Sequence, residues 1–214
     1  ALTLYRRLVL LALGLTAFVV VFGAYVRLSD AGLGCPDWPG CYGKLSPAHA
    51  SEQILDAHEA DPHGPVSLPK AWKEMIHRYL AAGLGLLIIA ISLLAWRQRG
   101  DARVSARVAW LLVGVVIFQG LLGKWTVTLL LKPAIVTAHL LGGLTTLALL
   151  SWLALRAVGV ERLQAGGPGG IAPRLCIGAR VGLALLFAQI ALGGWTSTNY
   201  AALACTDFPT CHGS

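Results

Sequence analysis

The stretch LVLLALGLTAFVVVFGAYV, residues 8–26, decides the fold class of this chain. It contains no charged residue, and a helix needs about 20 mainly apolar residues to cross the hydrocarbon of a bilayer. Four more long, mainly apolar runs follow, at residues 75–96, 109–131, 134–157 and 177–198. The sequence therefore predicts an all-α integral membrane protein with five transmembrane helices.

The distribution of positive charge predicts how these helices are oriented. The chain carries 17 Lys and Arg against 10 Asp and Glu, and positive residues near helix ends favour the cytoplasmic side. Most arginines lie before the first run, between the second and third, or between the fourth and fifth and at their facing ends: Arg6, Arg7, Arg97, Arg99, Arg103, Arg107, Arg156, Arg162, Arg174 and Arg180. These segments are predicted to face the cytoplasm, with the amino terminus. The excess of positive charge is therefore explained by the membrane topology, with lipid as the expected partner, and does not indicate nucleic-acid binding.

Four of the five cysteines fall in predicted extracytoplasmic loops, as two closely spaced pairs. The pairs are Cys35 with Cys41 and Cys205 with Cys211, and in an oxidising compartment both can close as disulfides. A metal site built from all four thiolates is the alternative that the spacing leaves open.

The two cysteine loops belong to an internal repeat. The pattern Cys-x-Asp-aromatic-Pro-x-Cys-x-Gly begins at Cys35 and again at Cys205, 170 residues later. Four predicted crossings separate the two copies, so the repeats are parallel, and a complete protein is expected to contain about eight helices. The predicted divisions are a first four-helix repeat at 1–160 with an extracytoplasmic loop at 28–73, a cytoplasmic linker at 161–176, and the start of a second repeat at 177–214.

Two histidines within the predicted helices are the candidate chemical centre, because ionisable side chains inside a bilayer are costly and mark functional sites. His77 lies early in the second helix and His139 early in the fourth. Both helices run inward from the extracytoplasmic side, so the two imidazoles are expected at similar depth near that face. Such a pair can bind a haem iron from opposite sides. The alternative is that each histidine hydrogen-bonds a neighbouring helix.

Charged residues near this pair extend the candidate site. Glu74 precedes His77 by three residues on nearly the same helix face. There it can act as an acid or base or stabilise developing charge beside bound porphyrin, or it can simply be favoured by the helix dipole. The cations Arg27, Lys73 and Arg78 can pair with haem propionates or extend to lipid headgroups. The other histidines are interpreted as solvated: His49, His58, His63 and His212.

Three segments resemble the haem A synthase family: GAYVRLSDAGLGCPDWPGC at residues 23–41, EMIHR at 74–78 and VTAH at 136–139. The resemblance covers essentially the whole chain. It implies a membrane mono-oxygenase that oxidises a methyl group of haem O, in successive hydroxylations, to the formyl group of haem A. It also implies that His77 and His139 hold the substrate haem and that Glu74 is important for oxidation.

The resemblance carries further expectations about location and partners. It implies a bacterial inner membrane, haem O synthase and terminal oxidase assembly factors as partners, and a homo-oligomer. It associates the Cys35–Cys41 pair with a disulfide near the haem, with either a redox or a structural role. A second repeat, whose equivalents of the two histidines are expected beyond Ser214, would hold a haem b that passes electrons. A b-type cytochrome electron carrier and a haem-transfer scaffold without oxygenase chemistry are the alternatives.

Overall fold

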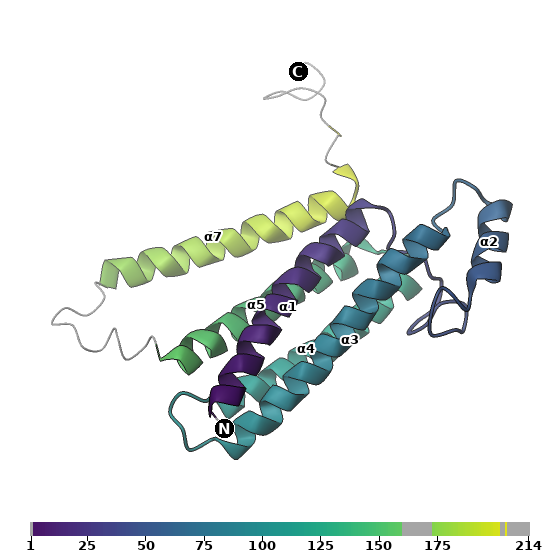
Figure 1. Cartoon of the computed structure of the whole chain (residues 1–214). Helices are drawn as coiled ribbons and strands as arrows, with labels where there is room; N and C mark the ends of the chain where they lie inside the picture. Colours follow the sequence, from purple (N-terminus) through teal and green to yellow (C-terminus); the bar gives the residue numbers. More distant parts are fainter. Residues whose placement is uncertain (1, 160–172, 202–203, 205–214) are drawn as a thin grey trace, which may run out of the picture.

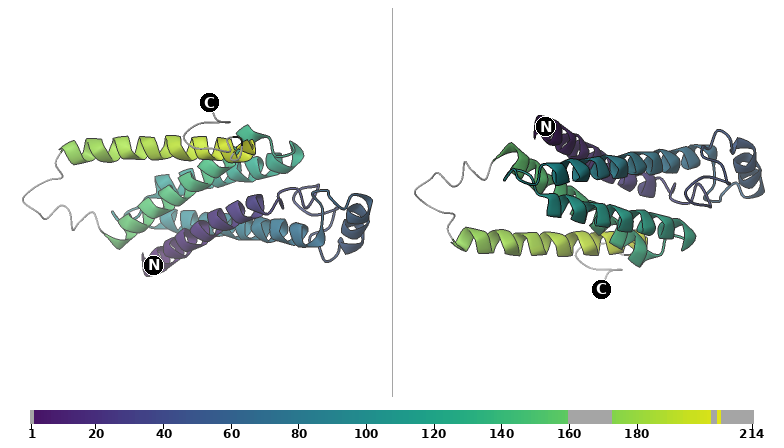
Figure 2. Two further views of the ribbon diagram at one scale, coloured as in Figure 1. Left: turned by 90° about the horizontal axis from the view of Figure 1, so that it is seen from above. Right: turned by 90° about the horizontal axis from the view of Figure 1, so that it is seen from below.

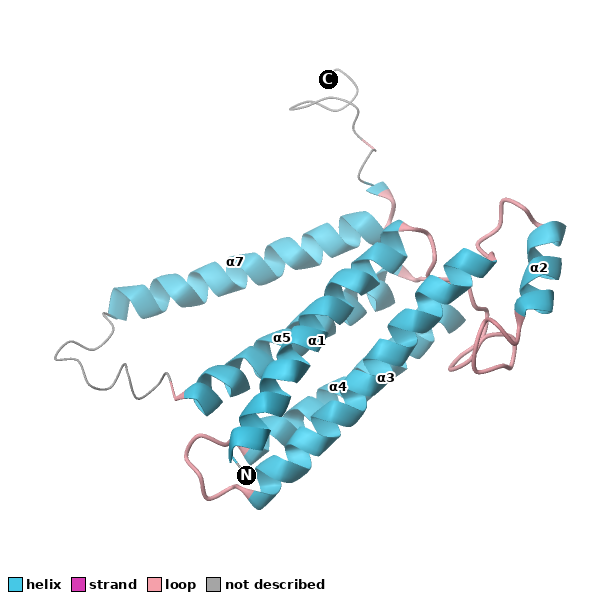
Figure 3. Cartoon of the chain, in the orientation of Figure 1, coloured by secondary structure: helices cyan, strands magenta, loops and turns pink. Residues whose placement is uncertain are grey.

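A computed structural model describes residues 2–159, 173–201 and 204 of the chain. These residues form helices joined by loops, and the described part contains no β-strand (Figure 3). Five helices are long and apolar enough to cross a membrane, which confirms the predicted fold class. They are α1 (Leu2–Leu28), α3 (Leu68–Arg97), α4 (Ala106–Thr128), α5 (Pro133–Val158) and α7 (Pro173–Thr198), and the short α2 spans Ser51–Ala60 (Figure 1).

Four of the long helices form a closed ring. In this ring α1 packs against α3 and α5, and α4 packs against the same two helices. Helices α3 and α5 therefore lie diagonally across the bundle. Successive helices run in opposite directions (Figure 1), so α3 and α5 are parallel, as in an up-down four-helix bundle.

The tightest apolar packing lies at the amino-terminal end of the bundle, where α1 begins. Tyr5, Ile88, Leu112 and Leu150, one from each helix of the ring, are almost completely buried there. Ser92 adds a polar link between helices, because its hydroxyl lies 2.8 Å from a backbone carbonyl oxygen of α4. His77 and His139 lie toward the opposite end. We call it the loop end because it carries α2 and the disulfide loop, residues 35–44, which contains a disulfide between Cys35 and Cys41.

Helix α7 packs on the outside of the ring, against α5 (Figure 2). Gly194 makes a close approach possible, since a Cβ at this position would lie 3.0 Å from Cδ2 of Leu140. At the loop end, Arg27 of α1 donates a 3.2 Å hydrogen bond to the carbonyl oxygen of Ser197. These two residues are 170 positions apart, the same offset as the sequence repeat. The division into repeats remains a prediction.

The segment predicted as a long loop, residues 28–73, contains more helix than the sequence indicates. Helix α2 lies within it, and Ile54 of α2 is buried against a cluster that includes Cys35, Cys41 and Met75. Helix α3 also begins inside this segment, at Leu68, with a proline in its first turn where the missing N–H costs nothing. Each transmembrane helix begins before its apolar run, and α7 begins at Pro173 rather than at residue 177. Helix α4 ends earlier than its run, at Thr128 rather than at residue 131.

Candidate functional site

The two candidate histidines occupy diagonal helices of the ring. His77 is nine residues from the start of α3 and His139 six residues from the start of α5, or about 14 and 9 Å along the helices at 1.5 Å per residue. The Nδ1 atoms of both are buried without a hydrogen-bond partner among the described residues. The alternative of a hydrogen bond to a neighbouring helix therefore finds no support at Nδ1.

Each imidazole packs against a glycine of an adjacent helix. A Cβ at Gly23 of α1 would lie only 2.8 Å from Cε1 of His77, whereas a Cβ at Gly123 of α4 would lie 3.6 Å from Cε1 of His139. The ring of Phe22 lies beside His77, with 6.3 Å between ring centroids. Glycine at position 23 thus leaves room for the His77 ring, and any larger residue would have to displace it.

These features fit a pair of axial haem ligands. Haem iron accepts neutral imidazole nitrogens from its two faces, and ligands on diagonal, parallel helices can approach a flat group from opposite sides. The described residues contain no cluster of three or more His, Cys, Asp or Glu that would hold a metal ion. Neutral imidazoles are the kind of ligand that binds an iron already held in a porphyrin, and the role of His77 and His139 as ligands remains a prediction.

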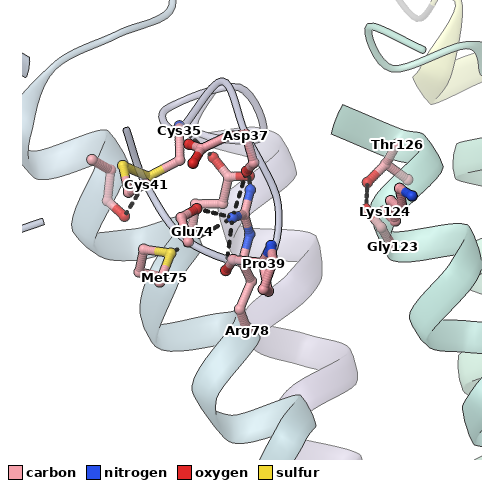
Figure 4. A network of polar contacts seen from close by, with 12 residues as sticks. Cys35, Asp37, Pro39, Cys41, Glu74, Met75, Arg78, Gly123, Lys124 and Thr126 are labelled. Atoms are coloured by element: carbon pink, nitrogen blue, oxygen red, sulfur yellow. Dashed lines mark hydrogen bonds and ion pairs between the residues drawn. A yellow bond between two sulfur atoms is a disulfide. The ribbon is translucent and has the colours of Figure 1, made fainter. Parts of the chain in front are cut away.

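Both carboxylate oxygens of Glu74 have hydrogen-bond partners, one in the disulfide loop and one on α3 (Figure 4). Oε2 accepts a 2.9 Å hydrogen bond from the backbone N–H of Cys35, and Oε1 accepts one of 2.5 Å from Nη2 of Arg78. Only 6% of the Glu74 side chain and 12% of the Arg78 side chain are exposed. The carboxylate lies one helical turn from His77, but its oxygens already have partners within the protein.

Arg78 fastens the other arm of the same loop to α3. Its Nη1 donates to the carbonyl oxygens of Asp37, at 2.9 Å, and Gly40, at 2.6 Å (Figure 4). Glu74 and Arg78 together clamp both sides of the loop closed by the Cys35–Cys41 disulfide. The sequence did not predict this clamp. Its only local signal was the i,i+4 spacing of a carboxylate and a guanidinium, which is common on helix surfaces.

The disulfide loop has an internal support of its own. The Asp37 carboxylate accepts hydrogen bonds from the backbone N–H groups of Tyr42, at 2.6 Å, and Gly43, at 2.7 Å. Both residues have positive φ angles, of 51° and 72°. Burial, together with the nearby Asp37 charge, raises the pKa of the Tyr42 phenol. Asp37 therefore stabilises a tight turn in a conformation that few side chains favour.

The cysteine predictions have separate outcomes. Cys35 and Cys41 form a disulfide, so their thiolates are unavailable for the alternative four-thiolate metal site. Cys205 and Cys211 lie outside the described residues, and their pairing remains a prediction.

The three cations predicted to contact propionates have different surroundings. Arg78 is engaged by the disulfide loop and Glu74. Lys73 places its Nζ 4.8 Å from the centre of the Tyr25 ring. Arg27 lies at the loop end, 4.3 Å from the centre of the Tyr200 ring, and it lines a cavity there. None of these contacts tests a role toward haem.

The four histidines interpreted as solvated also differ. His49 is exposed, and His212 lies outside the described residues. His58 is partly buried, with Nδ1 3.1 Å from the carbonyl oxygen of Val66, so it contacts protein as well as solvent. His63 is exposed but lines the same cavity as Arg27.

Comparison with known proteins identifies the family. The family described as cytochrome oxidase assembly protein, COX15-CtaA, matches residues 6–214. The chain belongs to this family.

Its curated relatives include proteins named haem A synthase. That of Shewanella oneidensis is 45% identical, over 93% of this chain and 58% of its own length. Those of Halalkalibacterium halodurans and Sphingopyxis alaskensis are each 30% identical over 91% of this chain, covering 60% and 59% of their own lengths. The family resemblance inferred from sequence is confirmed. The chain spans about three-fifths of the length of these relatives, and no solved structure matches it.

Proposed function

We propose that this chain forms the haem O-binding half of a haem A synthase, with His77 and His139 holding the substrate haem from its two faces. The observation that carries the proposal is the pair of imidazoles on diagonal, parallel helices with buried, unpartnered Nδ1 atoms. The haem A synthase of Shewanella oneidensis, 45% identical, supports the choice of substrate. A simple structural role for the histidines would instead require hydrogen-bond partners.

The proposed reaction oxidises a methyl group on the haem O ring to a formyl group. Each of two hydroxylations consumes one dioxygen, two electrons and two protons, and releases one water. Loss of a further water from the doubly hydroxylated carbon leaves the formyl group. In this reaction the two histidines orient the porphyrin, while the apolar helices around them exclude bulk water. A haem b held by a second repeat would supply the electrons.

Glu74 is the proposed proton donor or acceptor, because it lies one turn from His77 on α3. Its oxygens are bonded to the Cys35 amide and to Arg78. Proton transfer therefore requires one oxygen to exchange its present partner for the substrate. This requirement couples the proposed chemistry to the position of the disulfide loop.

The proposed location is a bacterial inner membrane, with the amino terminus in the cytoplasm and the disulfide loop outside. Arg97, Arg99 and Arg103 lie in or beside the connection from α3 to α4, at the end of the bundle opposite the disulfide. This arrangement agrees with positive charge on the cytoplasmic side and with a disulfide on the oxidising side.

A b-type cytochrome that only carries electrons is the second candidate function. It is favoured by one observation, which is that both Glu74 oxygens already have protein partners. An electron carrier needs the two histidines but no free carboxylate beside its haem.

Analysis of the bound pigment distinguishes the two functions. The full-length protein is purified in detergent, and its pigment is identified by chromatography and mass spectrometry. His77→Ala and His139→Ala variants are compared with a control, His49→Ala, which changes an exposed histidine. We expect haem O, a hydroxylated intermediate or haem A, lost in the first two variants and retained in the control. Finding only haem b, or the same pigment in all variants, would favour the electron carrier or overturn the site.

A further inference from the structure

A polar cavity lies at the loop end of the bundle, beyond the histidine pair. Its volume is about 290 Å³. Its walls come from the end of α1 and the loop that follows, the loop between α2 and α3, the start of α3, the turn between α4 and α5, and Tyr200 after α7. We call it the loop-end cavity. Its charged and aromatic lining consists of Arg27, Asp30, His63, Lys70 and Tyr200.

The helix register connects the loop-end cavity to the proposed haem site. Lys70 precedes His77 by seven residues, which places it two turns away on the same face of α3. Arg27 follows Gly23 by four residues on α1, and Gly23 is the residue against which the His77 ring packs. The faces of α1 and α3 that meet at His77 therefore continue into the cavity. Arg27 lies about 6 Å beyond Gly23 along α1, and Lys70 lies about 10 Å from His77 along α3.

The cations of the cavity have unused capacity to bind an anion. Arg27 keeps a buried Nε without a hydrogen-bond partner among the described residues. Its nearest acid, Asp30, lies 3.7 Å from Nη1 and is largely exposed. Lys70 is partly buried and makes no salt bridge within the described part of the chain. Two cations thus face one carboxylate, so the lining retains an excess of positive charge even when His63 is neutral.

We propose that the loop-end cavity receives the propionate carboxylates of the haem held by His77 and His139, with Lys70 and Arg27 as their cationic partners and His63 at the rim. The inference rests on the function proposed above. A porphyrin with its apolar body between the histidines must direct its carboxylates to a polar region, because burying an unpaired charge is costly. Lysine and arginine are the side chains that compensate such groups.

This assignment differs from the one made from sequence. Arg78 is already bonded to the disulfide loop and Glu74, and Lys73 lies over Tyr25. Lys70 and His63, which sequence reasoning did not select, take their places. Arg27 is common to both assignments.

The test compares haem b, which has two free propionates, with its dimethyl ester, in which both are uncharged. Binding of each ligand to the purified, detergent-solubilised protein is followed by optical titration. Subtracting the signal of the His77→Ala variant isolates this site. We expect Lys70→Gln to weaken binding of the free acid roughly fivefold and to leave ester binding unchanged. Each ligand is compared with itself across variants, so differences in detergent partition cancel.

Two further lysines supply matched controls. Lys44→Gln removes the same charge from an exposed position in the disulfide loop and should affect neither ligand. Lys73→Gln tests the other lysine near the start of α3. The assignment would be overturned if Lys73→Gln weakened binding of the free acid and Lys70→Gln did not. Raising the salt concentration should weaken free-acid binding more than ester binding in the unaltered protein, which tests the charge interaction without a variant.

The remaining outcomes separate this inference from the function on which it rests. Equal effects of Lys70→Gln on both ligands, or no effect on either, overturn the cavity as a propionate site while leaving the histidine pair intact. Failure of both ligands to give any signal that depends on His77 overturns the proposed haem site itself, and the cavity assignment with it.

Discussion

Replacement of Gly23 by alanine should weaken haem binding with little effect on the folded bundle. The added Cβ would lie 2.8 Å from Cε1 and 3.3 Å from Nε2 of His77, several tenths of an ångström closer than ordinary van der Waals contact. The imidazole must therefore move. Overpacking of this kind costs about 1–3 kcal/mol, which corresponds to a roughly five- to 150-fold loss of affinity when binding requires the original ring position.

The effect on folding should be smaller, because the ring can rotate aside when no haem is bound. Alanine also favours a helix over glycine by roughly 0.5–1 kcal/mol, which offsets part of any remaining strain. Gly14→Ala is the matched control, since it lies on the same helix and a Cβ there meets nothing within 4 Å. Gly123→Ala should have little effect, because its Cβ would meet His139 at an ordinary 3.6 Å.

Haem titration and the visible spectrum of the bound pigment provide the assay. Gly23→Ala should show lower affinity and weaker bis-histidine features in its spectrum, while Gly14→Ala should match the unaltered protein. Unchanged affinity and spectrum in Gly23→Ala would refute the placement of His77 as a ligand from this side of the bundle.

Two more changes test contacts that hold the bundle and its loop together. Glu74→Ala removes the acceptor of the Cys35 amide and leaves a nearly buried guanidinium without its carboxylate, which should lower the free energy of unfolding by about 3–5 kcal/mol. A membrane-impermeant phosphine should therefore reduce the disulfide faster in this variant than in the exposed control Glu52→Ala. An unchanged rate would show that the clamp does not hold the loop. Ser92→Ala removes a hydroxyl that hydrogen-bonds to a neighbouring helix and should lower the free energy of unfolding in detergent by about 0.6–1 kcal/mol. Thr145→Ala removes a hydroxyl that hydrogen-bonds to its own helix and should lower this free energy less. Equal effects of the two substitutions would contradict the importance of the link between α3 and α4.

Helix α2 and the Glu74 clamp illustrate what sequence patterns leave out. Helix α2 has ten residues, too few for stable helix formation in isolation, and it depends on burying Ile54 against the disulfide cluster. The clamp joins Glu74 to Cys35, 39 positions away in the chain. Both features depend on residues that become neighbours only after folding.

The sequence by itself determined the transmembrane helices, the Cys35–Cys41 pair and the family. Crossing a bilayer imposes a length and an apolar composition that are visible in any single segment, whatever that segment packs against. Only the tertiary structure decided that α3 and α5 are diagonal partners, that Gly23 accommodates the His77 ring, and that Arg27 lines a cavity while Arg78 clamps a loop. A charged side chain near a helix end can extend to lipid, ligand or loop at similar energetic cost, so its partner is decided by which groups the fold brings within hydrogen-bonding distance.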